Sequence, residues 1–194
     1  MGNKKAASND AILTLGRSRA FLIRNLLEYA GIIAVWLAFL AIHQWTGMSN
    51  TAASLLALGL CWAKTAFFGA ENLRQLLLAS VRNMPYHQFM LLMLVNMSQI
   101  ILSFGLDFHC LHQVNAASFS VEPGVFVGWE LVFEYVYFST LNFTFFGYGD
   151  DTPQTVVAKL MTMTEILLAF VTVIFLLSDF ISLKESISRK EPSK

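Results

Sequence analysis

The stretch YFSTLNFTFFGYGDDTP, at residues 137–153, sets a tyrosine between two glycines and lies between two apolar runs. The run that leads into it, 129–143, has about 15 residues, whereas a helix needs about 20 to cross a bilayer. The run that follows it, about 156–183, is long enough to cross. The first run is too short to cross, turn-forming residues follow it, and a full span comes next. This order predicts that the segment around 129–153 enters and leaves the membrane on the same side.

The composition of the whole chain agrees with a membrane location. Of 194 residues, 56% are hydrophobic and 13% are charged, against about 25% charged in a typical soluble domain. The 13 basic and 13 acidic residues cancel, so nothing indicates a nucleic-acid partner. We therefore expect an all-α integral membrane protein in contact with a lipid bilayer.

The remaining membrane spans are predicted from the stretches that lack charged residues and from the turn-forming residues that interrupt them. Residues 29–63 carry no formal charge and are interrupted only by TGMSN at 46–50. Lys64 is expected to extend its side chain towards the membrane interface. Pro85 suits the first turn of a helix. Four spans are predicted, at about 27–45, 51–70, 86–106 and 156–183, with a short or continuing helix at 71–84 and a polar loop at 107–128.

The basic residues predict the orientation, because cytoplasmic loops are enriched in Lys and Arg. The loop at 46–50 and the segment 107–156 have none. Four crossings would place all the clusters on one side, so both termini are expected to be cytoplasmic, in a plasma or bacterial inner membrane. The clusters are Lys4, Lys5, Arg17, Arg19 and Arg24; Arg74 and Arg82; and Lys184, Arg189, Lys190 and Lys194.

The stretch 137–153 resembles the pore of the potassium channel superfamily. That family has an aromatic pair and Ser, four residues, then Thr-Thr-Val-Gly-Tyr-Gly-Asp and a nearby Pro. The spacing from Tyr137 to Pro153 matches without a gap. The resemblance implies a homotetramer that conducts potassium or other monovalent cations, with no cofactor. It divides the chain into an N-terminal segment (1–25), a three-helix membrane region (26–106), a pore domain (107–183) and a tail (184–194).

The resemblance also assigns roles to residues. Rings of backbone carbonyls replace the hydration shell of the ion in such a filter. Glycines supply the positive φ angles that allow successive carbonyls to point at one axis. The filter would be Phe145, Phe146, Gly147, Tyr148, Gly149 and Asp150, supported by Tyr137, Phe138 and Thr144. The inner pore would be lined by Phe170, Val173, Leu177 and Ile181.

The filter departs from the family at one position that matters for conduction. Phe145 replaces the Thr whose hydroxyl lines the innermost ion site, and Phe146 replaces the Val that follows it. Four phenyl rings would crowd the inner end of the filter. Two alternatives therefore stay open beside a potassium channel: a weakly selective cation pore, and a non-conducting homologue that acts as a regulatory or structural subunit.

Several polar residues invite a functional interpretation. Glu165 lies within the last span, and we expect it either to hydrogen-bond to Asn142 or Thr140, or to take part in permeation or proton sensing. Asp179 is either part of an inner acidic ring or a solvated helix end. Six acids in the outward segment would attract cations: Asp107, Glu122, Glu130, Glu134, Asp150 and Asp151.

Other functions find little support in the sequence. His109, Cys110 and His112 do not have standard zinc spacing and are expected to be surface residues near a helix end, with an extracellular zinc or proton inhibitory site as the alternative. Asn96, Ser98 and Gln99 are expected to hydrogen-bond to neighbouring helices. No catalytic constellation stands out, so an enzyme is not expected.

Overall fold

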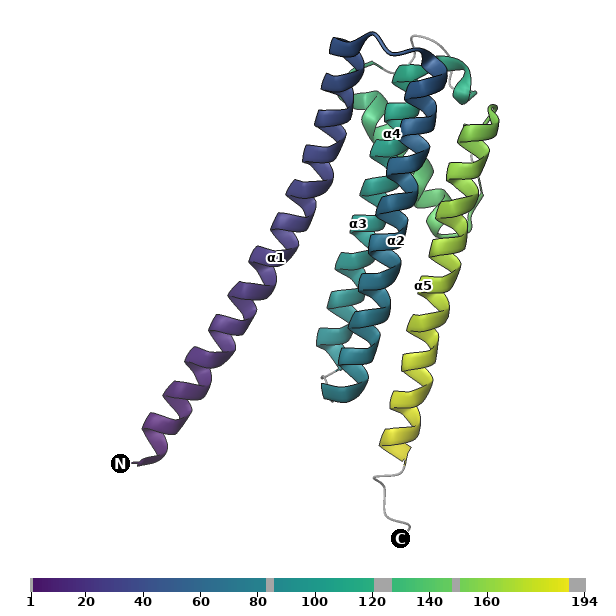
Figure 1. The fold of residues 1–194 in the computed structure, drawn as a ribbon. Helices are drawn as coiled ribbons and strands as arrows, with labels where there is room; N and C mark the ends of the chain where they lie inside the picture. The colour runs from purple at the N-terminus through teal and green to yellow at the C-terminus, as the bar shows by residue number, and fades with distance from the viewer. Residues whose placement is uncertain (1, 83–85, 121–126, 148–150, 189–194) are drawn as a thin grey trace.

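The computed structural model describes residues 2–82, 86–120, 127–147 and 151–188, without the side chains of 2–21, 72–73, 75–89 and 178–188. The described residues are helical apart from short connections (Figure 1). The helices are α1 (Gly2–Thr46), α2 (Asn50–Arg82), α3 (Tyr86–Val114), the 3₁₀ turn η1 (Ala116–Ser118), α4 (Trp129–Phe143) and α5 (Val156–Ser188).

Four of these helices are long and apolar enough to cross a membrane, over Leu22–Thr46, Asn50–Glu71, Met90–Val114 and Val156–Leu177. The expected all-α fold with four membrane helices is therefore confirmed, and the chain is a multi-pass membrane protein. Figure 1 shows the start of α1 and the end of α5 at one end of the bundle and the α1–α2 loop at the other. Helix α4 lies between the third and fourth spans along the chain.

The α1–α2 loop forms where the turn-forming residues predicted it. Gly47 has a φ of 55°, in the left-handed region that glycine adopts readily. The carbonyl of Ser49 accepts the N–H of Ala53 at 3.0 Å, which starts the second helix. Helix α1 begins at Gly2, far before the expected start near residue 27. Of the two alternatives for 71–84, the continuing helix is the correct one as far as Arg82.

Helix α3 is longer than predicted. The sequence suggested that the span ends near residue 106 and that a polar loop follows, but the helix continues to Val114. The expected loop is wrong for 107–114 because the polar side chains there have partners on other helices. Asp107 pairs with Lys64, and His112 bonds to Tyr135.

The core is built around α3, which packs against α1, α2, α4 and α5. Its tightest contact is at Gly105, where an added Cβ would lie 2.7 Å from the Cα of Val136 in α4. Such small residues allow membrane helices to approach closely. Figure 1 shows α1 leaning away from the other helices towards its N-terminus.

Polar contacts also tie α1 to α3. Tyr29 and Ser98 are hydrogen-bonded, and Gln99 Nε2 donates to Glu28 Oε2 at 3.0 Å, as expected for helix-joining groups. Asn96 Nδ2, by contrast, has no hydrogen-bond partner within the part of the chain that the structure describes. Near these contacts, Arg24 and Arg74 both lie close to Glu71.

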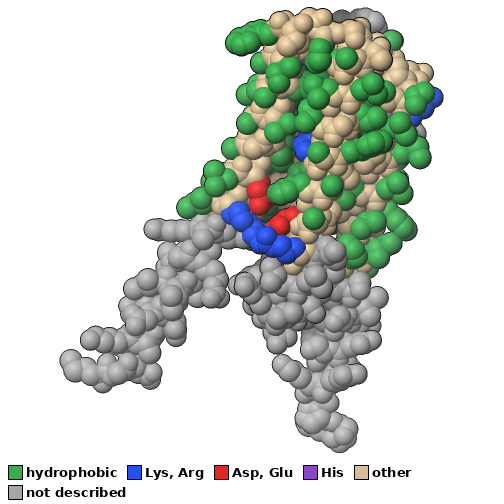
Figure 2. Space-filling model, viewed as in Figure 1, with side chains coloured by type: hydrophobic (Ala, Val, Ile, Leu, Met, Phe, Trp, Pro, Cys, Tyr) green, Lys and Arg blue, Asp and Glu red, His purple; other side chains and the backbone are tan. Residues whose placement is uncertain are grey.

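Figure 2 shows charged side chains gathered near the lower end of the coloured surface, with hydrophobic side chains dominating above.

Candidate functional site: the α4–α5 region

Helix α4 has the bounds that the sequence predicted, Trp129–Phe143, and ends in a defined turn. The N–H of Phe145 donates to the carbonyl of Asn142 at 3.2 Å, and the N–H of Phe146 donates to that of Leu141 at 3.0 Å. This pair of bonds is a Schellman motif, which satisfies the last carbonyls of a helix. The motif fixes the direction in which the chain leaves α4 and enters the glycine-tyrosine-glycine segment.

Phe145 occupies the position of this motif where glycine is usual. Its φ is 61°, and no other non-glycine residue in the described chain has a positive φ. A left-handed conformation costs an L-residue about 1–2 kcal/mol. Sequence reasoning missed this strain. A signal for it was present, because the expected helix ends at Phe143 and the residue two positions later is not the glycine that usually adopts this conformation.

The rest of the filter segment is described only in part. Gly147 has a φ of 98°, which confirms the expected positive angle there. Tyr148, Gly149 and Asp150 lie outside the described residues. Phe146 is 84% exposed in the single chain, and Phe145 is 50% exposed. The first residues after α4 therefore leave the core of the subunit.

The two aromatic residues expected to support the filter face different surroundings. Phe138 is buried and lies edge-on to Phe108 and Phe119, with ring centroids 5.1 and 5.6 Å apart. Tyr137 is half exposed on the other side of α4. Thr144 caps α4, and its hydroxyl donates to the carbonyl of Thr140 at 2.7 Å. Phe138 therefore anchors α4 to α3, which sequence reasoning did not foresee.

The chain after the filter is bound to the loop that follows α3. The N–H of Ser120 donates to the carbonyl of Thr152 at 3.0 Å, and the N–H of Gln154 donates to that of Ser118 at 2.8 Å. The N–H of Thr152 donates to the Ser120 hydroxyl at 2.8 Å. These bonds fix Pro153 opposite Phe119. No sequence motif predicted them.

Glu165 lies inside the subunit, with none of its surface exposed. Asn142 Nδ2 donates to its Oε2 at 3.2 Å, so one of the two expected contacts is present. The other is absent, because the Thr140 hydroxyl donates to the carbonyl of Val136 in its own helix. Sequence reasoning missed Ser139, whose hydroxyl is hydrogen-bonded to Glu165 Oε1.

The outer face of α5 carries three of the residues expected to line the inner pore. Phe170 and Leu177 are 55% and 53% exposed in the single chain, and Val173 is half-buried. The side chains of Ile181 and Asp179 lie outside the described residues. The opposite face of α5 packs inside the subunit, with buried residues at 158, 161, 162, 165, 168, 169 and 172.

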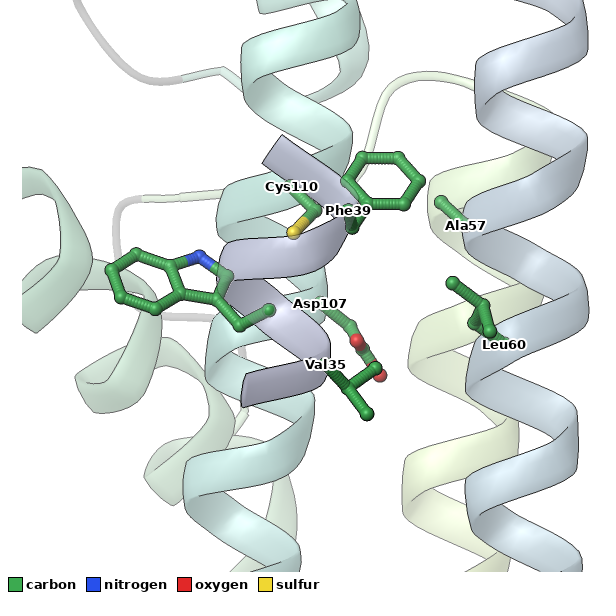
Figure 3. Close-up of a pocket in the computed structure, with 7 residues that line it drawn as sticks. Val35, Phe39, Ala57, Leu60, Asp107 and Cys110 are labelled. Carbon is green, nitrogen blue, oxygen red and sulfur yellow. The ribbon is translucent and has the colours of Figure 1, made fainter. Parts of the chain in front are cut away.

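Two expectations about charged residues are wrong. Lys64 does not reach the interface, and Asp107 does not lie in an outer loop, because the two form an ion pair between α2 and α3. Beside Asp107 is a cavity of about 10 Å³, which is about the size of one water molecule (Figure 3). Glu130 is exposed and Asp151 is buried, while Glu122 and Asp150 lie outside the described residues.

The structure places His109 of α3 in the interior, so the expectation of a surface histidine is wrong there, and His112 is half-buried. His109 is buried; Trp36 Nε1 donates to its Nδ1 at 3.3 Å, and its Nε2 lies 3.3 Å from Gln113. His112 Nδ1 lies 2.8 Å from the Tyr135 hydroxyl. Among the described residues, no three His, Cys, Asp or Glu side chains are grouped so that they could hold a metal ion.

Comparison with known families identifies the class of this region. Residues 90–185 match the Ion_trans_2 family model, which describes an ion channel. The match reaches beyond the resemblance at 129–183 and takes in most of α3. These residues therefore carry an ion channel pore domain, which supports a channel rather than an enzyme. No curated protein and no solved structure shows a significant match to the chain.

Proposed function

We propose that this protein is a homotetrameric, passive cation channel that conducts potassium. The observation that carries the proposal is the path of the chain around α4. A helix of 15 residues, held by Phe138 against α3, ends in a capped turn that leads to Gly147 with a φ of 98°. One chain supplies one filter strand, so four chains are needed to surround an ion.

In this proposal the ion contacts the backbone carbonyls of Phe145, Phe146, Gly147 and Tyr148. Tyr137, Phe138 and Thr144 support the filter, and Asp150 lies at its outer end. Phe170, Val173, Leu177 and Ile181 line the inner pore, where the exposure of Phe170 and Leu177 in the single chain supports the assignment. Asp179 would add an acidic ring below them.

Phe145 is proposed to narrow the inner end of the filter. Four phenyl rings offer no oxygen to replace water, and uncompensated desolvation of an ion is costly. A hydrophobic constriction can also gate by dewetting. The carbonyls further out would preserve selectivity while conductance falls. The rival arrangement places the rings behind the filter, where they leave the axis clear.

Both termini are proposed to face the cytoplasm of a plasma or bacterial inner membrane. Figure 1 shows the start of α1 and the end of α5 at the same end of the bundle, and the basic clusters of the sequence precede the first span, follow the second and follow the last. The filter would then open towards the outside. The buried Asp107 no longer contributes to a negative outer mouth, so exposed Glu130 carries more of that field.

Rubidium uptake by vesicles that contain the purified full-length protein tests the function. We expect uptake that external potassium inhibits more strongly than sodium does, and that Gly147→Ala abolishes, because a φ of 98° disfavours any side chain. Equal inhibition by sodium and potassium would indicate a weakly selective pore. No uptake by an inserted, intact tetramer would indicate the non-conducting alternative.

A further inference from the structure

The interior of the subunit contains a chain of hydrogen bonds that joins three helices. It begins at Glu165 of α5, passes through Ser139 of α4 and ends at the carbonyl of Ile101 in α3. Ser139 lies about one turn before the capped end of α4. One turn beyond Ile101, Gly105 allows α3 and α4 to approach closely.

The number of hydrogens that Ser139 can donate decides whether Glu165 carries a proton. The Ser139 hydroxyl lies 2.9 Å from the Ile101 carbonyl and is also hydrogen-bonded to Glu165 Oε1. A hydroxyl has one hydrogen to donate, and a carbonyl can only accept. Both contacts are good hydrogen bonds at once if Ser139 donates to Ile101 and Glu165 donates to Ser139. That arrangement requires a proton on Oε1 of Glu165.

The remaining contacts of Glu165 agree with a neutral acid. Its Oε2 accepts one hydrogen bond from the Asn142 amide, at 3.2 Å. Among the described residues, no Lys, Arg or His forms an ion pair with it. The titratable groups facing it are Asp107 of α3, already paired with Lys64, and the thiol of Cys61 in α2. Helix α4 presents only neutral Ser139 and Asn142.

We propose that Glu165 is a protonated carboxylic acid at neutral pH and that its proton positions the end of α4. The neutral acid donates to Ser139 and accepts from Asn142, two residues spaced by three on one face of α4. Asn142 also supplies the carbonyl that accepts the N–H of Phe145 in the capping turn. Glu165 is thus a positioning residue for the entry to the filter, not a group on the ion path. Removal of the proton would force Ser139 to turn to the carboxylate and release Ile101.

Infrared difference spectra of the full-length protein test this proposal without any ion flux. We expect the wild type at pH 7, compared with Glu165→Gln, to show the carbonyl stretch of one protonated carboxyl group per chain. The band should shift when glutamate carboxyls carry ¹³C, a measurement that needs no variant. Ser139→Ala should also shift the band, because the acid loses its acceptor. Glu130→Gln, which removes an exposed glutamate of α4, is the control and should leave the band in place.

A folded wild type without a ¹³C-sensitive band at pH 7 would overturn the proposal, whatever the channel conducts. A second measurement compares side-chain replacements. Glu165→Gln can donate to Ser139 and accept from Asn142 as the neutral acid does, so its thermal midpoint should match that of the wild type at pH 7 and should not fall as the pH rises. Glu165→Leu should unfold at a lower temperature throughout. If Glu165→Gln and Glu165→Leu lowered the thermal midpoint equally at pH 7, the result would contradict a neutral Glu165.

Discussion

Lys64 of α2 and Asp107 of α3 form an ion pair inside the helix bundle, where their side chains are only 17% and 12% exposed. The pair joins the second span to the helix that carries α4, because Asp107 lies two residues beyond the Gly105 contact. Helix α2 is therefore bound to the pore domain by charge as well as by apolar packing.

Removing either partner of this pair is expected to destabilise the protein strongly. Asp107→Leu and Lys64→Met each leave one buried charge without its counterion, which costs about 3–5 kcal/mol in other buried pairs. The double variant Lys64→Met/Asp107→Leu should recover most of the loss, because no buried charge remains. Thermal unfolding followed by circular dichroism measures all three. Additive losses in the double variant would show that the two charges do not interact.

Phe145→Asn is expected to raise rubidium uptake if the phenyl rings narrow the filter. Asparagine tolerates the left-handed conformation that Phe145 adopts at a φ of 61°, so the turn after α4 should survive. Phe145→Thr is the informative companion, because a β-branched residue is strained at this φ and should yield less tetramer. Uptake is compared at matched incorporation. An intact Phe145→Asn tetramer with unchanged or lower uptake would reject the constriction.

Gly105→Ala is expected to disrupt the contact between α3 and α4. The added methyl group would lie 2.7 Å from a backbone atom of Val136, and overpacking of this kind costs about 1–3 kcal/mol. Gly59→Ala in α2 is the matched control, since nothing lies within 4 Å of its added methyl group and alanine favours helix. Thermal midpoints should fall for Gly105→Ala and stay level or rise for Gly59→Ala. Equal midpoints in the two variants would argue against the close approach.

The proposed orientation predicts which introduced cysteines react with a membrane-impermeant thiol reagent. Cysteine at Ser49, in the α1–α2 loop, should be labelled from outside intact cells, and cysteine at exposed Arg74 only after the cells are opened. The wild type serves as the blank, because Cys61 and Cys110 are both buried. External labelling at Arg74 would reverse the topology and remove the support for an outward-facing filter.

Native mass measurement in mild detergent should give a tetramer of about 87 kDa, four times the 21.7 kDa chain, before bound lipid is counted. The reason is that a single glycine-tyrosine-glycine strand cannot surround an ion. A stable dimer would leave the filter incomplete, and the proposal of conduction would then fail.

The sequence predicted α4 to the residue and the turn after α1 closely, because both depend on neighbouring residues. The 15 residues of α4, most of them apolar, begin after Gly128, whose φ is 60°, and stop before a glycine-rich segment. Local turn chemistry of this kind is visible in a single chain. The same holds for the positive φ at Gly147.

The end of α3 and the fate of its polar residues could not be predicted in this way. Asp107, His109 and His112 looked like loop residues because a helix interior rarely holds so many polar groups. Their partners, Lys64, Trp36 and Tyr135, are 43, 73 and 23 positions away. A pattern within one segment carries no information about contacts over such separations, so only the fold reveals that these groups are satisfied.

The bonds between 118–120 and 152–154 have a consequence for the entropy of the filter. Together with the capping turn at Phe145 and Phe146, they hold the chain on both sides of the glycine-tyrosine-glycine segment. A short segment with both ends fixed has far fewer conformations than a free loop of the same length. Much of the ordering cost of an ion-coordinating segment is therefore met when the subunit folds, before any ion arrives.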